Sequence, residues 1–345
     1  MNPVDLTLWY TAPADAWVEA LPVGNGRLGA MVFGGIAQER LQLNEDTLWS
    51  GGPRSGDNPA ARIVLPAVRE AIFAGRYVEA DRLAKQMQGI FTQSYLPLGD
   101  LWLDFAGFDA GAVTGYRRSL SLDDAVATTR YEHDNATFTR EVFASAPDQV
   151  IFVRVACDQP QRINLKVTAT SKLRFTVAAD DDATLRLAGR APSHVEPSYR
   201  QIDDAVHYHD DPAQMGMAFA LHVRVILEGA GTLATAVDPA TGAATLVVRA
   251  ADAVVLVVTA ATSFAGYDRA PAQGDVDPHA VAAVALEAAA RQPYARARSA
   301  HVVDYRALYT RITLDLGRGA SADLPTGERI RRYAADPDPA LATLL

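Results

Sequence analysis

The sequence predicts a mainly β protein: a large antiparallel β-sandwich (a super-sandwich) with a few inserted helices and a C-terminal helical linker. Three observations support this fold class. Apolar residues alternate with period two through much of residues 101–170 and 217–258, which is typical of half-buried strands. Glycine, aspartate and proline separate these short runs, as turns do. The strand–helix–strand alternation of a parallel doubly wound sheet is missing.

The first 90 residues predict strands followed by two helices. Residues 28–35 form an apolar run bounded by glycine, and Leu41 and Leu43 alternate with polar residues. Asp57 or Asn58 can cap a helix that has Pro59 near its first position and ends at Gly75. A second helix is expected over residues 77–88. The apolar stripe on the first helix predicts that the pair packs on or beside the sandwich; it comprises Ile63, Leu65, Val68, Ile72 and Phe73.

The carboxyl-terminal part changes character after about Pro278. Residues 280–290 are almost all alanine, valine and leucine, which favours a helix, and a second helix is expected over residues 294–309. A short strand over residues 312–316 and helices over 326–333 and 339–345 are predicted next. We therefore divide the chain into a β-sandwich domain at residues 1–265 and a helical linker at 278–345. The apolar end, with Leu341, Leu344 and Leu345, predicts burial against further protein.

The charge balance narrows the choice of partners. Acidic residues number 41 and basic residues 32, for a formal net charge of -9. An acidic chain without a basic patch favours neither nucleic acid nor an anionic membrane as a partner, and it is compatible with a neutral sugar. The single cysteine, Cys157, excludes an intrachain disulfide and is expected to pack as a small apolar residue.

No leader or membrane span is visible in the sequence. No apolar run approaches about 18 residues, and the first residues lack a basic region followed by an apolar stretch. These features predict a cytoplasmic location as the chain is written. A leader missing from this sequence would make the expected location periplasmic or secreted.

Residues 44–49 (NEDTLW) are the main candidate for a binding site. Asn44, Glu45 and Trp49 bring an amide, a carboxylate and an indole together in a loop that leaves a strand. Amides and carboxylates hydrogen-bond sugar hydroxyls, and an aromatic ring covers the apolar face of a sugar. The alternative is that Trp49 belongs to the core and that Asn44 or Asp46 binds backbone in a turn.

Two neighbouring features allow a structural interpretation beside a functional one. Asn25 lies between two glycines, where a tight turn is expected and a ligand contact is the alternative. Glu45 and Asp46 are adjacent, and adjacent residues of a strand point to opposite faces. We therefore do not assign them as the acid and base of a glycosidase, and no catalytic residue is assigned.

The segment 207–211 (HYHDD) contains residue types that bind metals. His207 and His209 could share one face of a strand, but a zinc site needs a third protein ligand, which the sequence does not supply. A polar surface loop is the alternative interpretation. No metal and no cofactor are assigned.

Several long motifs occur in a fixed order along almost the whole chain. Together they resemble the amino-terminal domain and linker of glycoside hydrolase family 95, the α-L-fucosidases. The motifs are residues 22–35 (PVGNGRLGAMVFGG), 43–53 (LNEDTLWSGGP), 95–101 (YLPLGDL), 116–120 (YRRSL), 140–145 (REVFAS), 304–308 (DYRAL) and 314–317 (LDLG).

The resemblance implies the amino-terminal portion of an inverting glycosidase that acts on terminal α-linked fucose, or on a related galactose-type sugar, of oligosaccharides. Its implied partners are the oligosaccharide and the chain's own (α/α) catalytic barrel. In the family, the acid and the water-activating residues lie in that barrel, downstream of every motif matched here. The chain alone is therefore expected to be inactive. The alternative is a non-catalytic carbohydrate-binding or structural β module.

Overall fold

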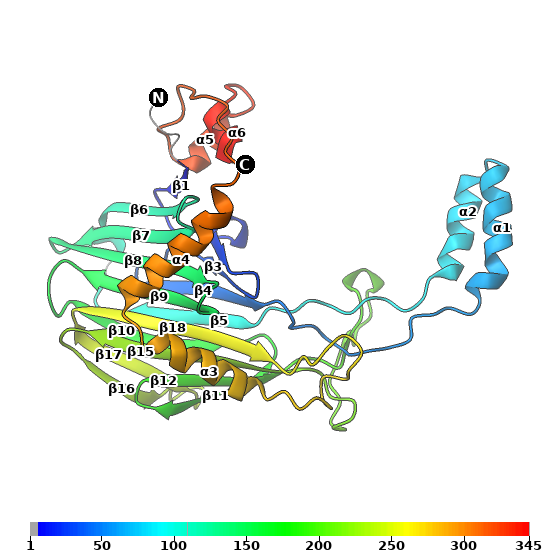
Figure 1. Cartoon of the computed structure of the whole chain (residues 1–345), viewed down its shortest axis with the longest axis horizontal. Helices are drawn as coiled ribbons and strands as arrows, with labels where there is room; N and C mark the ends of the chain where they lie inside the picture. The colour runs from blue at the N-terminus through cyan, green and yellow to red at the C-terminus, as the bar shows by residue number, and fades with distance from the viewer. Residues whose placement is uncertain (1–5, 109, 345) are drawn as a thin grey trace.

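A computed structural model describes residues 6–108 and 110–344 of the chain. It consists of two stacked antiparallel sheets (Figure 1). The nine-stranded sheet runs, in spatial order, β1 (Thr7–Tyr10), β6 (Thr114–Ser121), β7 (Val126–His133), β8 (Ala136–Ser145), β9 (Val150–Cys157), β18 (Ala253–Thr262), β15 (Ala218–Glu228), β12 (Thr184–Arg190) and β11 (Arg174–Asp181). The predicted antiparallel β-sandwich is confirmed.

The second sheet has seven strands. They are β16 (Thr232–Val237), β17 (Ala244–Ala251), β10 (Ile163–Thr170), β5 (Gly99–Phe105), β4 (Gln38–Glu45), β3 (Leu28–Val32) and β2 (Leu21–Gly24). A separate two-stranded sheet joins β13 (His194–Val195) to β14 (Val206–His207). Short 3-10 turns lie at Trp17–Glu19, Lys85–Met87, Ala110–Ala112 and Ser198–Arg200.

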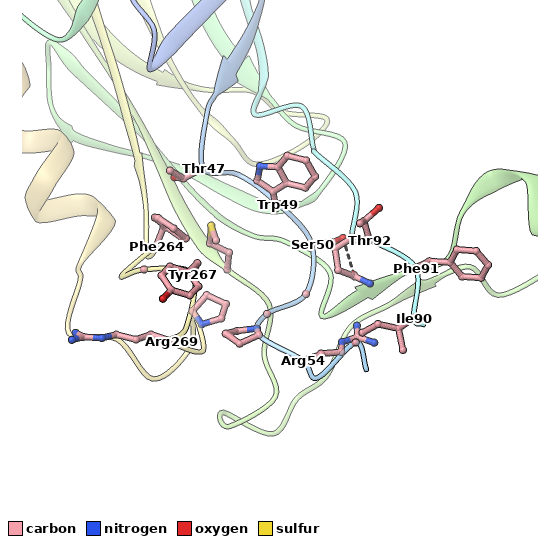
Figure 2. A pocket seen from close by; sticks show the side chains of 18 of the residues that line it. Thr47, Trp49, Ser50, Arg54, Ile90, Phe91, Thr92, Phe264, Tyr267 and Arg269 are labelled. Carbon is pink, nitrogen blue, oxygen red and sulfur yellow. Dashed lines mark hydrogen bonds between the residues drawn. The ribbon is translucent and has the colours of Figure 1, made fainter. Parts of the chain in front are cut away.

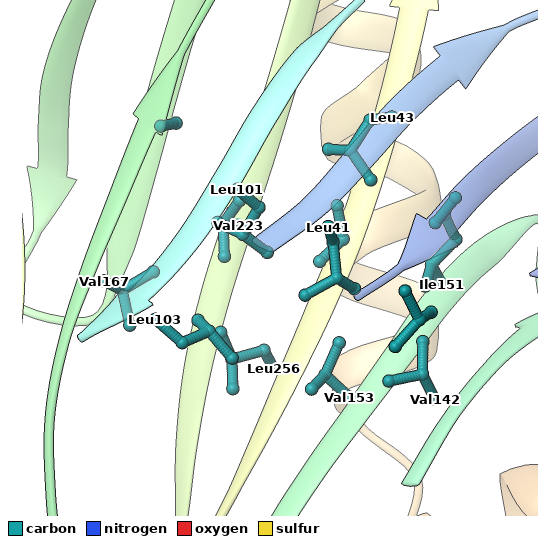
Figure 3. Packing of buried hydrophobic residues seen from close by; sticks show 14 of the residues in the cluster. Leu41, Leu43, Leu101, Leu103, Val142, Ile151, Val153, Val167, Val223 and Leu256 are labelled. Atoms are coloured by element: carbon teal, nitrogen blue, oxygen red, sulfur yellow. The ribbon is translucent and has the colours of Figure 1, made fainter. Parts of the chain in front are cut away.

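The core lies between the two sheets and follows from the period-two pattern. Leu41, Leu43 and Leu103 point inward from the seven-stranded sheet, and Val153 and Leu256 meet them from the nine-stranded sheet (Figure 3). One charged pair also spans this interior: the buried Glu39 carboxylate of β4 bonds the buried Arg140 guanidinium of β8. This pair links the two sheets, and loss of either partner would leave the other charge buried and uncompensated, which is costly.

Two long helices cover the outer face of the nine-stranded sheet, α3 (Pro278–Ala290) and α4 (Tyr294–Tyr309) (Figure 1). The Asp277 side chain caps α3 by accepting from the His279 backbone N–H at 2.9 Å. Leu286 of α3 and Tyr294 of α4 pack in a second apolar cluster with Phe143 and Phe152 of the sheet. Both helices agree with the sequence-based prediction.

The first two helices depart from the prediction. α1 (Ala61–Phe73) and α2 (Tyr77–Ala84) form, but Figure 1 shows them as a hairpin standing away from the sandwich rather than packed on or beside it. Val68 and Ala80 are buried between the two helices, whereas Ile63 is 80% and Phe73 is 87% exposed. The amphipathic pattern was sufficient to predict a helix, but each helix finds its apolar partner in the other.

The carboxyl-terminal segment contains α5 (Thr326–Arg332) and α6 (Pro339–Leu344). The predicted strand at residues 312–316 is wrong: this stretch is irregular, and Leu314 is 57% exposed because no neighbouring strand is available. Leu341 is buried within this chain itself, contrary to the expected burial against further protein. Leu345 lies outside the described residues. Among the helices of the described ranges, none is long and apolar enough to cross a membrane.

Candidate functional site

A cavity of about 720 Å³ opens where β4 and β18 end and β15 begins. Residues 46–56 after β4 form one wall, and residues 90–93 before β5 form another. Phe264, Tyr267 and Pro271, from the segment after β18, complete the lining together with Met217. In Figure 2, Phe264 and Tyr267 lie on one side of Trp49, and Phe91 lies on the other. The cavity is thus built from segments that are distant in sequence.

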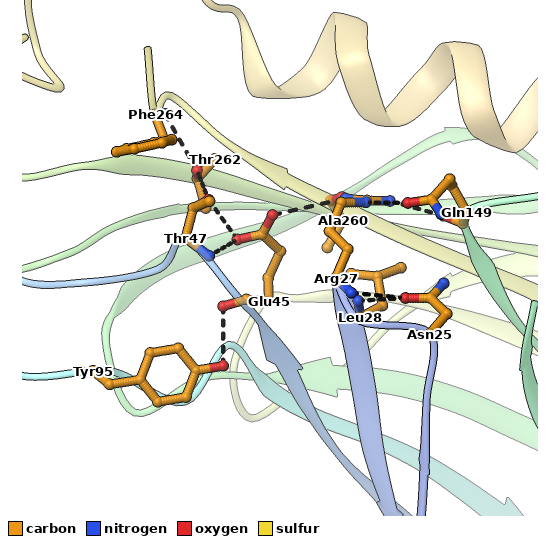
Figure 4. A network of polar contacts seen from close by, with 10 residues as sticks. All are labelled: Asn25, Arg27, Leu28, Glu45, Thr47, Tyr95, Gln149, Ala260, Thr262 and Phe264. Atoms are coloured by element: carbon orange, nitrogen blue, oxygen red, sulfur yellow. Dashed lines mark hydrogen bonds and ion pairs between the residues drawn. The ribbon is translucent and has the colours of Figure 1, made fainter. Parts of the chain in front are cut away.

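The segment that leaves β4 is anchored by Glu45 and Thr47 (Figure 4). Glu45 is buried, and its Oε2 accepts from the backbone N–H of Thr47 at 2.8 Å and from the Thr47 hydroxyl at 2.7 Å. The other carboxylate oxygen, Oε1, lies 3.7 Å from the Arg27 guanidinium. Burial is the main reason why the pKa of Glu45 is raised, although the bonds from Thr47 and the charge of Arg27 oppose it.

These bonds continue to the opposite sheet. The Thr47 and Thr262 hydroxyls are 2.5 Å apart, and Thr262 Oγ1 accepts from the Phe264 backbone N–H at 3.2 Å. When Glu45 is ionised, Thr47 donates to the carboxylate, so Thr262 must donate to Thr47. The chain of donors therefore runs in one direction, from Phe264 to Glu45, and ties two cavity walls together.

Trp49 presents an aromatic surface to the cavity. Its ring centroid lies 5.4 Å from that of Tyr95, its Nε1–H donates to the Asp46 carbonyl at 3.2 Å, and the side chain stays 44% exposed. A bridge between the backbones of Trp49 and Tyr95 fixes this position. The Asp46 carbonyl thus holds the polar edge of the indole and the Tyr95 ring packs beside it, while part of the indole remains open to a ligand.

The cavity holds other exposed aromatic residues, which the sequence analysis did not identify. Phe91 is 38%, Phe264 43% and Tyr267 89% exposed, and all three line it. Phe91 stands before β5, and Phe264 and Tyr267 stand in the segment after β18, and no local pattern distinguishes them from ordinary loop aromatics. Only the spatial proximity of these two segments to Trp49 could have identified them.

Of the four predicted binding residues, the structure places only Trp49 in the lining of this cavity. Trp49 lines the cavity, but Asn44 and Glu45 end strand β4 rather than lying in a loop, and the Tyr95 hydroxyl donates to the Glu45 backbone carbonyl at 3.1 Å. Asn25 braces the predicted turn: its Oδ1 accepts from the backbone N–H groups of Arg27 and Leu28, at 3.0 and 2.7 Å. The contacts of the Asn25 and Glu45 side chains are structural ones, and a role in binding stays a prediction for these two residues and for Asn44.

The histidine segment lies at a second cavity. His207 belongs to β14 and pairs with His194 of β13, while His209 follows as an exposed residue. Within the described ranges, no group of three histidine, cysteine, aspartate or glutamate side chains is arranged to hold a metal ion.

Comparison with known proteins identifies the class. Residues 8–267 match the model of the glycosyl hydrolase family 65 N-terminal domain, which covers the whole sandwich. The chain therefore belongs to the glycosyl hydrolases that carry this amino-terminal domain. Residues 293–345 match the glycosyl hydrolase family 95 catalytic domain, so the resemblance to family 95 is confirmed as well.

The similar curated proteins agree with this assignment. "Alpha-L-fucosidase 2" of Arabidopsis thaliana is 31% identical over 349 residues, which span 99% of this chain. "Probable alpha-fucosidase A" is 28% identical both in Aspergillus niger, over 98% of this chain, and in Aspergillus oryzae, over 90%. The chain spans about two fifths of the length of these relatives, 41% of each.

Proposed function

We propose that this chain is the amino-terminal portion of an α-L-fucosidase-like, inverting glycoside hydrolase that acts on terminal α-linked fucose, or a related galactose-type sugar, of oligosaccharides. The chain's part would be to bind and orient the sugar, with Trp49 as the central contact. The observation that carries the proposal is the group of exposed aromatic side chains at one cavity, in a chain whose relatives are named α-fucosidases.

The cavity suits binding better than cleavage. An inverting glycosidase needs an acid and a base on opposite faces of the sugar, about 6.5–9.5 Å apart. Among the residues that line the cavity in the described part of the chain, Asp46 carries the only carboxylate. Glu45 is buried with both oxygens engaged, so it is poorly placed to act as the second group.

The aromatic surface suits a sugar for a simple physical reason. The C–H groups on one face of a pyranose are apolar and pack on an aromatic ring, while its hydroxyls need polar partners at the edge. Asp46, Ser50 and Gln93 supply such partners around the aromatic residues of the cavity. Trp49 needs no rearrangement to accept a ring, because Asp46 and Tyr95 already hold it.

The binding proposal is tested by titrating the whole 345-residue chain with an α-linked fucosyl disaccharide in a calorimeter. We expect Trp49→Ala to weaken binding by about tenfold, which corresponds to about 1.4 kcal/mol. Trp17→Ala is the matched control, since Trp17 is 56% exposed and does not line the cavity. Equal affinity of the Trp49 variant and wild type, at unchanged Tm, would refute the proposal.

The same preparation tests the absence of catalysis. We expect no release of fucose from the disaccharide by residues 1–345. Release that is lost in Asp46→Asn but kept in Trp17→Ala would show that the chain carries its own catalytic group.

A free-standing carbohydrate-binding module is the second candidate function, and the same cavity supports it. Such a module would bind the disaccharide, but adding it to a longer relative would not change the rate at which that relative hydrolyses the disaccharide.

A further inference from the structure

A second cavity of about 550 Å³ lies against the first. Both cavities are lined by Pro271 and by the segment 51–54, so Arg54 faces both. The second cavity is more polar than the first; its other lining residues include Ser193, His194, His207, Tyr208, His209 and Gln214. The segment 51–54 thus forms a ridge between an aromatic cavity and a polar one.

Hydrogen bonds fix the protonation of the histidine that holds Arg54. The backbone N–H of Val195 donates to Gln93 Oε1 at 3.1 Å, so the amide nitrogen Nε2 of Gln93 must be the atom 2.9 Å from His194 Nδ1. Since Gln93 Nε2 can only donate, His194 Nδ1 must accept and carries no proton. The ring proton is therefore on Nε2, which lies 3.1 Å from Glu196 Oε1.

Arg54 is consequently positioned without being neutralised. Its Nη2 lies 2.6 Å from the same His194 Nδ1, which is a neutral acceptor. Among the residues that the structure describes, no carboxylate forms an ion pair with Arg54. Glu196 is the nearest acid in this network, and it already bonds His194 and Arg200.

The local charge favours an anion, although the chain as a whole is acidic. A guanidinium has five N–H donors arranged as a fork that matches two oxygens of one oxyanion, and Arg54 uses one nitrogen of the fork on His194. Arg269, which also lines the first cavity, has no carboxylate partner within the described ranges either. Among the described residues that line the two cavities, Asp46 is the only acid.

We propose that Arg54 is an oxyanion subsite at the ridge between the two cavities, and that the saccharide bound here carries a sulfate ester or a carboxylate beside the sugar that packs on Trp49. This inference rests on the proposed function for the sugar and extends it to acidic saccharides. His194 would be a positioning residue, because it holds the guanidinium and does not touch the ligand, and Gln93 would fix which nitrogen of His194 accepts from Arg54.

The test is calorimetric titration of the whole chain with four probes: fucose, a fucose sulfate ester, a uronic acid, and inorganic sulfate. We expect the sulfate ester or the uronic acid to bind about tenfold more tightly than fucose, as one charge-assisted hydrogen bond would give. Comparing these two ligands decides which oxyanion the subsite takes. Raising the salt concentration should reduce the preference, whereas fucose binding should not change.

Arg54→Gln should remove this preference, so that the acidic sugars bind the variant no more tightly than fucose does. Arg69→Gln is the matched control, since Arg69 is an exposed arginine of α1 outside both cavities. Persistence of the preference in Arg54→Gln, or equal wild-type affinity for fucose and both acidic sugars, would overturn the inference while leaving the proposed function intact. Binding of inorganic sulfate but of no sugar would overturn the proposed function and the saccharide part of the inference together.

Discussion

Helix α3 and the α1–α2 hairpin differ in how well the apolar pattern of each helix agrees with the burial of its side chains. α1 has a clear apolar stripe, yet Ile63 near its start and Phe73 at its end are exposed, in a hairpin that stands away from the sandwich (Figure 1). α3 is apolar nearly all round, with Val284 73% exposed, yet it lies on the nine-stranded sheet and buries Ala282, Leu286 and Ala289. The sharper amphipathic pattern belongs to the helix that packs less.

This difference in packing follows from the strands to which each helix is connected. α3 follows β18 after a loop of residues 263–277, so it returns directly over the outer face of the sheet that β18 belongs to. The hairpin is inserted between β4 and β5, neighbours in the seven-stranded sheet, and is joined to them by the cavity-lining segments 46–56 and 90–93. Apolar pattern thus predicts that a helix forms, and connectivity decides what it meets.

The largest expected effect is a loss of stability in α3, which the α1–α2 hairpin should not show. Leu286→Ala should lower the free energy of unfolding by about 2–5 kcal/mol, because Leu286 is 2% exposed and the sheet residues around it cannot close the space. Chemical denaturation measures this change. Val284→Ala on the same helix is the control and should change it by less than about 0.5 kcal/mol. Similar losses for both variants would mean that α3 does not pack on this face.

A smaller effect depends on pH and is confined to the contact between α3 and the sheet. His222 of β15 is buried, with its Nε2 3.0 Å from His279 Nδ1 of α3. Burial first, and His279 second, lower the pKa of His222 to about 4. The charged or titratable groups around it are His279, Asp180, Arg186 and Arg224.

Because this pKa lies below the ordinary value of 6.5, the unfolded chain binds a proton that the folded chain does not. The contribution of His222 to stability is therefore complete above about pH 6.5 and is lost as the pH falls toward about 4. His222→Gln should flatten the decrease measured by denaturation across this range, whereas His209→Gln, at an exposed position, should leave it unchanged. Equal pH profiles for wild type and His222→Gln would contradict this assignment.

The smallest expected effect tests the isolation of the hairpin. Phe73→Ser should change the free energy of unfolding by less than about 0.5 kcal/mol, because the Phe73 side chain is already 87% exposed. Urea denaturation of this variant beside Leu286→Ala gives the direct comparison. A loss as large as that of Leu286→Ala would show that the hairpin packs on the sandwich in solution, and the contrast between the two regions would fail.

The sequence predicted the local parts of this molecule well and the candidate site only in part. Alternation around Leu41 and Leu103 was enough to predict inward-facing strands, and the alanine-rich run 280–290 was enough to predict α3. The short run Ile312, Leu314 and Leu316 was misread as a strand, since a strand needs a partner that the local sequence cannot show. Trp49 was found because it stands in a dense motif.

The amino-acid sequence by itself therefore determined the β-sandwich class, the helices and the membership of a glycosyl hydrolase family, because these depend on periodicity and on motifs that are contiguous in the chain. Only the tertiary structure decided that Glu45 braces a wall rather than facing the cavity. It also brought Trp49, Phe264 and Tyr267 together and set Arg54 on a neutral His194. Those relations join residues far apart in sequence, and only the packing of the two sheets and their loops brings such residues within contact distance.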